Sequence, residues 1–177
     1  TDGRVYGWGA NANGQLGDLS TAARLTPTLL NTITGVTQVA AGASHTVARL
    51  WDGQVYAWGH NGSGRLGDGT TTQRTRPTLI PTLANIIAVA AGDTHSLALG
   101  SDGRVYAWGG NTNGQLGLGS TTGALVPTEI PALSGVVAIA AGASHSFAVT
   151  AAGQLFAWGL NAHSRLGDGT VTQRTSP

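Results

Sequence analysis

Three dipeptides place a hydroxyl directly before a histidine, which are the residue types of a nucleophile and its general base. They are Ser44-His45, Thr94-His95 and Ser144-His145. Adjacent residues of an extended strand point to opposite faces, so the two groups of one dipeptide do not form a nucleophile–base hydrogen bond. A buried histidine bonded to a backbone carbonyl or a neighbouring hydroxyl also explains the pattern. We therefore interpret His45, His95 and His145 as structural positions, with a ring of histidine metal ligands as the alternative.

Carboxylates are scarce, with seven Asp and the single Glu129 in 177 residues. They offer no distinct pair of the kind that glycoside hydrolysis requires. Asp68 and Asp168 lie in Gly-Asp-Gly-Thr turns, which supply too few oxygen ligands for a calcium loop. We interpret them as members of local ion pairs, with Arg65 and Arg165 as the nearby partners. We expect no catalytic residue, no metal site and no cofactor.

A glycine motif in the second quarter of the chain has the spacing of a dinucleotide-binding fingerprint. Gly62, Gly64 and Gly67 match it, but the fingerprint is meaningful only where it opens a helix after a strand. No helical periodicity follows these glycines. The chain also has no lysine, which excludes a P-loop.

Composition excludes several further classes. Charged residues make up 10% of the chain and the net charge is +1, so there is no basic excess to bind a nucleic-acid backbone. No apolar run approaches the ~18 residues of a membrane-spanning helix, so we expect no direct membrane insertion. The absence of cysteine excludes a disulfide framework and fits either redox compartment. The compartment is unknown, with a lean towards a bacterial extracellular or cell-surface location.

A period of 50 residues organises the whole chain, and fixed periods of this size indicate repeat architectures. It relates Trp8, Trp58, Trp108 and Trp158, the three histidines, and the glycines Gly42, Gly92 and Gly142. We interpret the repeated residues as structural positions, with a stacking platform as the alternative for the tryptophans. The repeat units are about 1–50, 51–100 and 101–150, with an incomplete unit at 151–177.

Each repeat is expected to form four short strands. In the second repeat these are 87–92, 95–99 and 104–109, with 77–81 as an edge strand because prolines flank it. The strand at 104–109 is apolar on both faces, which is typical of burial on both sides. A four-stranded repeat near 50 residues predicts a β-propeller blade. The chain is therefore expected to be an all-β, partial β-propeller over residues 1–177, with about 3.5 blades, three of them complete.

The repeated motifs resemble those of the regulator of chromosome condensation repeat. They are Val-Ala-Ala-Gly-x-x-His-Ser-Leu-Ala-Leu at 89–99, Asp-Gly-x-Val-Tyr-Ala-Trp-Gly at 102–109 and Asn-x-x-Gly-Gln-Leu-Gly at 111–117. The resemblance implies a seven-bladed propeller closed by strands from both termini. It also implies a broad range of functions, from nucleotide exchange on Ran and chromatin binding to light sensing, ubiquitin-ligase assistance and inhibition of β-lactamase. Protein binding through loops on a propeller face is common to them.

Two features used by the founding member of that family are missing from this sequence. The unbroken 50-residue step leaves no room for the inserted wedge of the exchange factor, and there is no basic tail for chromatin. Because the repeated positions are interpreted as structural, we expect the residues that determine partner specificity to lie where the repeats differ. Tryptophan and arginine are enriched in interface hot spots, which favours these residue types among the differing positions. The candidate partner-binding residues are Arg49, Trp51, His60, Arg76 and His163.

The sequence favours a non-enzymatic scaffold that binds a protein partner, of unknown identity, through loops on one propeller face. The alternative is an assembly module that pairs through open blade edges, since unpaired edge strands invite pairing. Exchange factor, enzyme inhibitor and metal-dependent enzyme are less favoured. The open edges are expected to meet either the remainder of the chain's own propeller or a second copy, and we expect the chain to be a fragment of a longer polypeptide.

Overall fold

The computed structural model describes residues 3–177, which form short antiparallel strands joined by loops. The strands are β1 (Tyr6–Gly9), β2 (Arg24–Leu29), β3 (Val36–Ala41), β4 (His45–Leu50), β5 (Val55–Gly59), β6 (Arg74–Leu79), β7 (Ile86–Ala91), β8 (His95–Gly100), β9 (Val105–Gly109), β10 (Ala124–Glu129), β11 (Val136–Ala141), β12 (His145–Thr150) and β13 (Leu155–Gly159). A 3-10 turn, η1, covers Ala162–Ser164. No helix among the described residues is long and apolar enough to cross a membrane.

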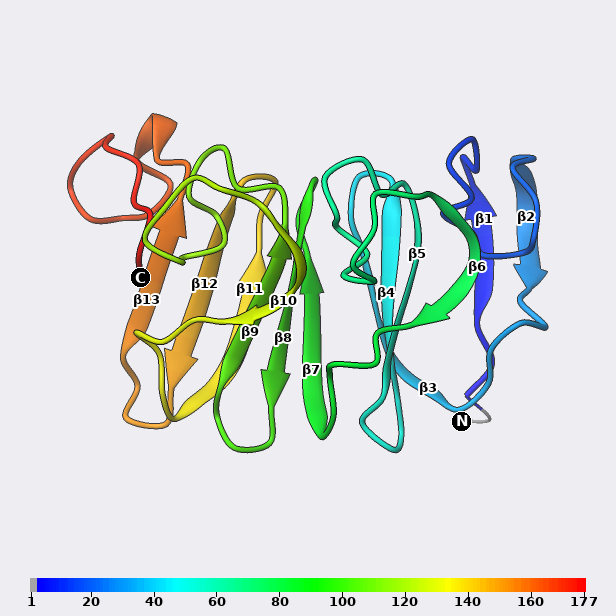
Figure 1. The fold of residues 1–177 in the computed structure, drawn as a ribbon, viewed down its shortest axis with the longest axis horizontal. Helices are drawn as coiled ribbons and strands as arrows, with labels where there is room; N and C mark the ends of the chain where they lie inside the picture. The colour runs from blue at the N-terminus through cyan, green and yellow to red at the C-terminus, as the bar shows by residue number, and fades with distance from the viewer. Residues whose placement is uncertain (1–2) are drawn as a thin grey trace.

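The strands form four sheets that lie side by side as propeller blades (Figure 1). Two blades are complete, with the orders β3-β4-β5-β6 and β10-β9-β8-β7. A third contains β11-β12-β13, and a sheet of β1 and β2 supplies the outer half of another. The predicted all-β fold of four-stranded blades is thus confirmed. The count of three complete blades was wrong, because the fourth strand of the β11–β13 blade is reduced to a single bridge between Gly159 and Arg174.

The outermost strand of each blade begins earlier than the prolines indicated. In place of 77–81, β6 runs from Arg74 to Leu79 and contains Pro77. Its pairing with β5 shifts register between Ala57 and Gly59, so the ladder is interrupted alongside the proline. A residue without an N–H is tolerated there because the strand lies at the edge of the sheet.

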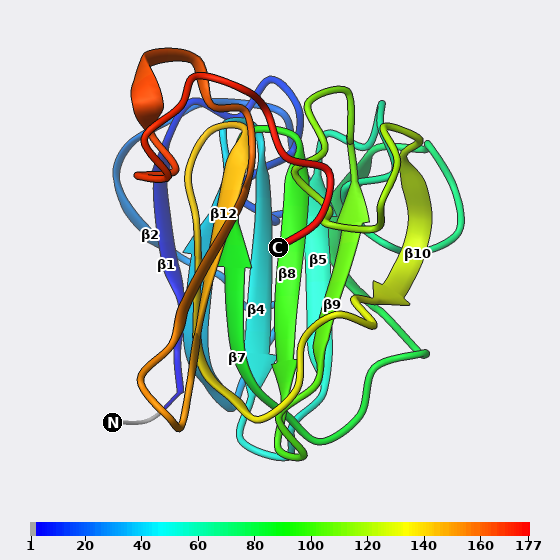
Figure 2. The ribbon, with the colours of Figure 1, turned by 90° about the vertical axis from the view of Figure 1, so that its left-hand side faces the viewer.

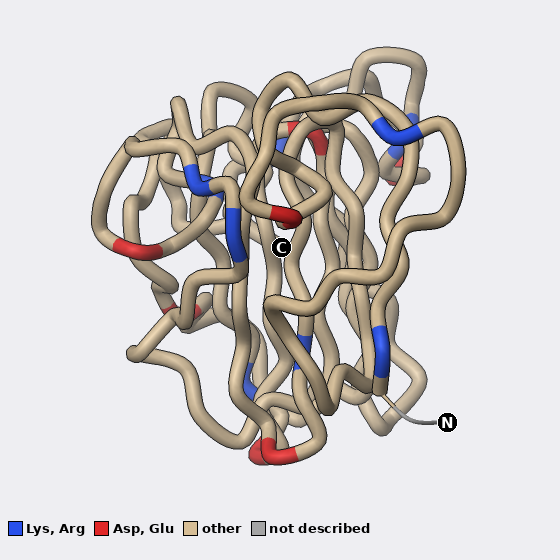
Figure 3. Tube along the Cα trace, turned by 90° about the vertical axis from the view of Figure 1, so that its right-hand side faces the viewer, with Lys and Arg blue, Asp and Glu red and all other residues tan. Residues whose placement is uncertain are grey.

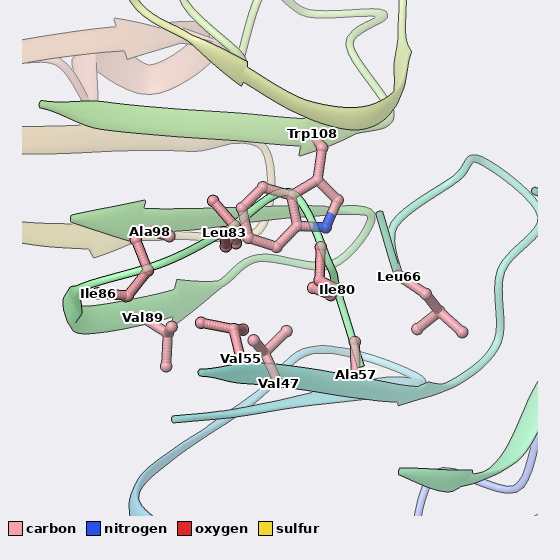
Figure 4. Close-up of a cluster of buried hydrophobic side chains, with 10 residues drawn as sticks. All are labelled: Val47, Val55, Ala57, Leu66, Ile80, Leu83, Ile86, Val89, Ala98 and Trp108. Atoms are coloured by element: carbon pink, nitrogen blue, oxygen red, sulfur yellow. The ribbon is translucent and has the colours of Figure 1, made fainter. Parts of the chain in front are cut away.

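The hydrophobic core lies between blades rather than within one. The cluster drawn in Figure 4 joins Val47 and Val55 of one blade to Val89 and Ala98 of the next, with Trp108 packed over them. Each of these side chains is at most 3% exposed. Both faces of an inner blade are therefore apolar, as the sequence predicts for the strand at 104–109.

The two terminal faces lack this cover. Trp8 is 60% exposed, whereas Trp58 is 1% exposed. At the opposite end, which faces the viewer in Figure 2, Leu155 of β13 is 65% exposed while the equivalent Val55 and Val105 are completely buried. Among residues 3–177 no further blade packs against these side chains, which explains their exposure.

The blade at that end also differs in its backbone. Ser164 has a φ of 55°, in a position where the other repeats have Gly14, Gly64 and Gly114. At Gly14 and Gly64 a Cβ atom would collide with the outer strand of the following blade, and at Gly114 it would lie 2.8 Å from the Thr175 Cα, next to the bridge at Arg174. At Ser164 no following strand is in contact, so a side chain fits.

Another glycine of each repeat allows an indole to approach the backbone. Gly67 has a φ of +72°, and a Cβ there would lie 2.8 Å from the Trp108 Nε1. Gly167 has nearly the same backbone, with a φ of +70°, but a Cβ there would meet nothing within 4 Å. A side chain at either position would strain the backbone, but only at Gly67 would it also collide with a neighbour. Comparing the two positions therefore separates the cost of backbone strain from the cost of steric conflict.

We predict that Gly67→Ala destabilises the fold more than Gly167→Ala does. Both substitutions strain the left-handed backbone by about 1–2 kcal/mol, and only Gly67→Ala adds an overpacking cost of about 1–3 kcal/mol. Urea unfolding of both variants and the parent chain measures the difference. Equal losses of free energy of unfolding would show that the indole does not depend on the glycine.

Candidate functional site

The repeated histidines bond to hydroxyls of the following blade. The His45 Nε2 lies 2.9 Å from the Ser96 Oγ, and the His95 Nε2 lies 2.9 Å from the Ser146 Oγ. All four side chains are buried. The hydroxyl that satisfies each histidine is therefore not the one beside it in the sequence, but one 51 residues further along.

The direction of these hydrogen bonds follows from the third partner. Ser96 donates to the backbone carbonyl of Arg65 at 2.9 Å, and a carbonyl can only accept. Because the single hydroxyl hydrogen is used there, the His45 Nε2–H must donate to the Ser96 oxygen. The His45 Nδ1 is buried with no hydrogen-bond partner among residues 3–177, which fits a neutral ring protonated on Nε2 alone.

The same carbonyl also accepts from tryptophan. The Trp108 Nε1 donates to the Arg65 carbonyl at 2.9 Å, as the Trp158 Nε1 does to the Gln115 carbonyl at 2.9 Å. Trp58 repeats this bond on the carbonyl of Gln15. The β3–β6 blade is thus fastened to the β7–β10 blade, and that blade to the β11–β13 sheet, by a histidine, a hydroxyl, a tryptophan and one shared carbonyl, which we call the seam. Between the β1–β2 sheet and the β3–β6 blade, Thr46 and Trp58 share the Gln15 carbonyl, and no histidine among residues 3–177 joins them.

Gly92 allows the histidine to enter the seam. A Cβ at this position would collide with the His95 ring and would lie 2.5 Å from the Gly142 carbonyl oxygen. Gly42 has the same relation to His45 and to the Gly92 carbonyl, and the ring of His145 likewise closes over Gly142. The repeated glycine is therefore a position of close approach near the inner strands.

The hydrogen-bond directions in the seam do not activate the serine hydroxyl as a nucleophile. A general base must accept the hydroxyl hydrogen, whereas here the His45 Nε2 already carries a proton and Ser96 directs its own hydrogen to a carbonyl. Burial lowers the pKa of His45 to about 3, with a further contribution from the charge of Arg65. Burial likewise lowers the pKa of His95 to about 4. Both rings are therefore neutral at neutral pH.

The loop carboxylates pair with a different arginine from the one expected. The Arg74 Nε donates to Asp68 at 2.8 Å, and the pair repeats as Arg174 with Asp168. Arg65 instead is buried and donates to the Asp93 carbonyl at 3.0 Å. The expectation of Arg65 was wrong because the loop turns back on itself and brings the start of β6 over the carboxylate.

An asparagine completes this cluster of Asn61, Asp68, Thr70 and Arg74, which we call the clasp. The Asn61 Nδ2 donates to the Asp68 carboxylate at 3.1 Å and to the Thr70 carbonyl at 3.0 Å, while its oxygen accepts from the Leu66 amide. Burial raises the pKa of Asp68, but the hydrogen bonds from Thr70 and Arg74 outweigh burial and hold it below its usual value. The clasp therefore uses its charges internally, and no group of three potential metal-ligating side chains occurs among residues 3–177.

The structure does not bring the candidate partner-binding residues together. Trp51 lies in the hairpin between β4 and β5, whereas His60 and His163 follow β5 and β13 at the opposite end of the strands. Arg76 is exposed on the outer strand β6. Arg49 lies near the hairpin end, where its Nη1 is 3.4 Å from the Ile86 carbonyl oxygen. Only Arg49 and Trp51 share one end of the blades.

Sequence reasoning missed the hydroxyl and carbonyl members of the seam. A Thr or Ser follows each repeated histidine directly, as in Thr46, Ser96 and Ser146, and this recurrence was the available signal. It also missed the arginine of the clasp, although Asp18, Asp68 and Asp168 are each followed six residues later by arginine. The third repeat lacks both members, having Leu118 and Ala124 instead.

We predict that the free energy of unfolding falls as the pH drops below about 6.5. The pKa of His95 is about 4 when folded and 6.5 without burial, so the unfolded chain binds more protons in that interval. Each such histidine contributes up to about 1.4 kcal/mol per pH unit, and nothing above its unfolded pKa. The carboxylates of Asp18 and Asp68 have pKa values below 3.8, so they titrate outside this interval.

Urea unfolding at pH 4.5 to 8 measures this dependence, with His95→Gln as the test variant and the exposed His163→Gln as its control. We expect His95→Gln to lower overall stability and to reduce the pH dependence, while His163→Gln leaves the dependence intact. An unchanged slope in His95→Gln would contradict the assignment.

Comparisons with known proteins agree with this architecture. A family model described as an RCC1-like domain matches residues 1–177. No curated protein sequence matches significantly. Among solved structures, human WBSCR16 is 29% identical with a TM-score of 0.89, over 99% of this chain and 48% of that one. Yeast RCC1 (Prp20), in its complex with Kap60, is 25% identical with a TM-score of 0.87, over 99% of this chain and 44% of that one.

A second structure of Prp20p from Saccharomyces cerevisiae is 25% identical with a TM-score of 0.86, over 97% of this chain and 45% of that one. This chain therefore spans less than half the length of these structural relatives. The predicted resemblance to the regulator of chromosome condensation repeat is confirmed, because the family model covers every blade and the seam recurs with its 50-residue step. The chain belongs to the RCC1-like domain family.

Proposed function

We propose that the chain is a non-enzymatic protein-interaction scaffold whose partner docks at the hairpin end of the blades, around Trp51. The observation that carries this proposal is the exposure of Trp51, which is 75% accessible to solvent. The equivalent hairpin residues are Ser101 and Ala151, so the indole is not needed to build a blade. Large aromatic side chains at rigid, exposed positions are frequent hot spots of protein interfaces.

The surroundings of Trp51 hold it in place. Its amide donates to the Gly35 carbonyl at 3.0 Å, which ties the hairpin to the turn between β2 and β3. A Cβ at Gly35 would lie 2.8 Å from the Trp51 Cδ1, so the indole rests directly against that turn. A bound partner would therefore meet an aromatic side chain whose backbone is already ordered, and preorganisation reduces the entropy lost on binding.

A hollow at the same hairpin offers a second contact. It has a volume of about 330 Å³ and begins at Asp52, the residue after Trp51, with Pro81, Leu83 and Asn85 among its other lining residues. Its apolar and polar groups together suit the mixed surface of a non-obligate protein interface. Arg49 approaches the same end of the blades, whereas His60 and His163 lie at the other end and are not part of this proposal.

Relatives of this family supply the second line of support. The solved structures include Kap60 bound to yeast RCC1 (Prp20), and a study of Prp20p that concerns its binding to Gsp1p and histones. Those partners belong to proteins more than twice the length of this chain. What they support here is the general use of an RCC1-like propeller as a surface for other proteins.

We predict that Trp51→Ala weakens the partner complex at least tenfold without loss of stability, because the indole is exposed in the free chain and buried in the complex. Proteins captured on the immobilised chain would be purified, and their Kd values measured by calorimetry with parent and variant. Ser101→Ala, at the equivalent position of the next hairpin, is the matched control and should bind like the parent. Unchanged affinity in Trp51→Ala would remove this surface, and failure of every purified protein to bind would overturn the scaffold function.

A further inference from the structure

Leu19 departs from its repeat by holding a strained backbone. It has a φ of 67°, in the left-handed region, where the other repeats have Gly69, Gly119 and Gly169. A residue with a Cβ atom is strained in this region, whereas glycine is not. The Leu19 amide donates to the Thr75 carbonyl at 2.9 Å, which ties this strained backbone to β6 of the neighbouring blade.

The fold gains little from this side chain in return. Leu19 is 64% exposed. The equivalent Gly69 makes the same kind of bond to β10 without any side chain, and the nearest atom to a Cβ there would be the Val126 Cγ1, at 3.8 Å. Backbone strain that packing does not explain is a reason to look for a binding role. The surface around Leu19 is therefore a candidate site.

Leu19 lines a hollow between two blades, which we call the outer hollow. It has a volume of about 430 Å³, within the range of sites that bury small ligands. Thr32, which follows β2, lies on the same side as Leu19 in the chain, and β6 supplies the other lining residues, Arg76, Pro77, Thr78 and Leu79. The outer hollow thus combines apolar side chains with a small number of polar groups, as ligand sites do.

Arg76 brings an uncompensated positive charge to the outer hollow. It is the one arginine among residues 3–177 whose guanidinium has neither a hydrogen bond nor an ion pair. The equivalent residues are Thr26, Val126 and Ser176, so no other repeat places a cation here. Charged residues make up 10% of the chain, and Figure 3 shows how sparsely they are distributed along it. A guanidinium with free donors suits a carboxylate, which it can bind through two parallel hydrogen bonds.

We propose that the outer hollow is a second protein-binding site, which takes an extended segment of a partner polypeptide that presents a carboxylate beside an apolar side chain. The apolar side chain packs between Leu19 and Leu79, and the carboxylate pairs with Arg76. One arginine is too little charge for a nucleic-acid backbone. Pro77 has no N–H to offer an added strand, so side chains provide the recognition. The site goes beyond the hairpin surface and does not rest on it.

A phage-displayed library of random heptapeptides, selected on the immobilised 177-residue chain, tests the site. We expect the selected peptides to share an Asp or Glu next to a Leu, Ile or Phe. A selected peptide would be synthesised with a fluorescein label, together with a copy in which the acid is replaced by its amide. Fluorescence anisotropy should give a Kd about tenfold lower for the acid peptide, because the amide cannot form the charged pair. Selection of no saturably binding peptide, or equal Kd values for the two peptides, would overturn the proposal.

Variants of the chain assign each contact. Arg76→Thr introduces the residue that the first repeat has, and it should weaken the acid peptide about tenfold while leaving the amide peptide unaffected. Val126→Thr, at the equivalent position of the next blade, is the matched control and should bind like the parent. Leu19→Gly removes the apolar wall and should weaken both peptides by the same factor. If Arg76→Thr weakened the two peptides equally, the arginine would not contact the carboxylate and the proposal would be wrong.

The stability of Leu19→Gly distinguishes a binding role from a structural one. Its midpoint of urea unfolding should equal or exceed that of the parent, since relief of strain offsets the freedom that glycine adds to the unfolded chain. A lower midpoint would assign Leu19 to the fold and contradict the proposal.

A further variant separates this site from the hairpin surface. Trp51 does not line the outer hollow, whereas Leu79 lines both this hollow and the one at the hairpin. The substitutions are therefore made at Leu19 and Arg76, which do not line the hairpin hollow. Trp51→Ala should bind the acid peptide with the affinity of the parent chain. Loss of peptide binding in Trp51→Ala would place the peptide at the hairpin end and remove the outer hollow as its site.

Discussion

A single backbone carbonyl between each pair of blades determines how the blades are joined. At the seam between the two complete blades, the Arg65 oxygen accepts from both Ser96 and Trp108, each at 2.9 Å. Because the hydroxyl hydrogen is committed to that oxygen, the histidine must donate, remain neutral and leave its other nitrogen without a partner. A buried polar group bonded to several partners specifies one arrangement of its surroundings far more narrowly than apolar contact does. The histidine tautomer follows from this one acceptor, which also holds the Nε1 of the buried indole.

This constraint also explains which residues recur and which vary. Inside the seam, Gly92 makes room for an imidazole and Gly67 for an indole, so their substitution is restricted by atoms of other side chains. At the hairpin end, Trp51 has Ser101 and Ala151 as equivalents, and no seam contact depends on its identity. A repeat protein is thereby divided into a part that stacks and a part that is free to acquire binding residues. The proposed interaction surface belongs to the second part.

The architecture could be predicted from the sequence because its evidence is periodic. The recurrence of Trp108, His95 and Gly92 at 50-residue steps fixes blade size, and alternation along 104–109 predicts a strand buried on both faces. Contacts between repeats could not be predicted, because a histidine at position 95 is compatible both with metal binding and with a hydrogen bond to Ser146. The choice of Arg74 over Arg65 for Asp68 depended on the path of a loop. The partner-binding residues are harder still to predict, because an exposed residue such as Trp51 belongs to no repeating pattern within a single sequence.

The blades stack in a row, and Ser164 marks the one repeat whose loop has a side chain at the position of Gly14, Gly64 and Gly114. At Gly14, Gly64 and Gly114 the bare backbone lets the outer strand of the next blade settle against the loop. The serine puts a Cβ into the space that this strand would occupy, on a backbone that glycine alone adopts without strain. A blade added in the usual way would have to displace its outer strand or distort the loop. One hydroxymethyl group thus distinguishes a loop with room for an outer strand from a loop in which that room is smaller, and the same position offers a means of tuning how engineered copies of this repeat pack.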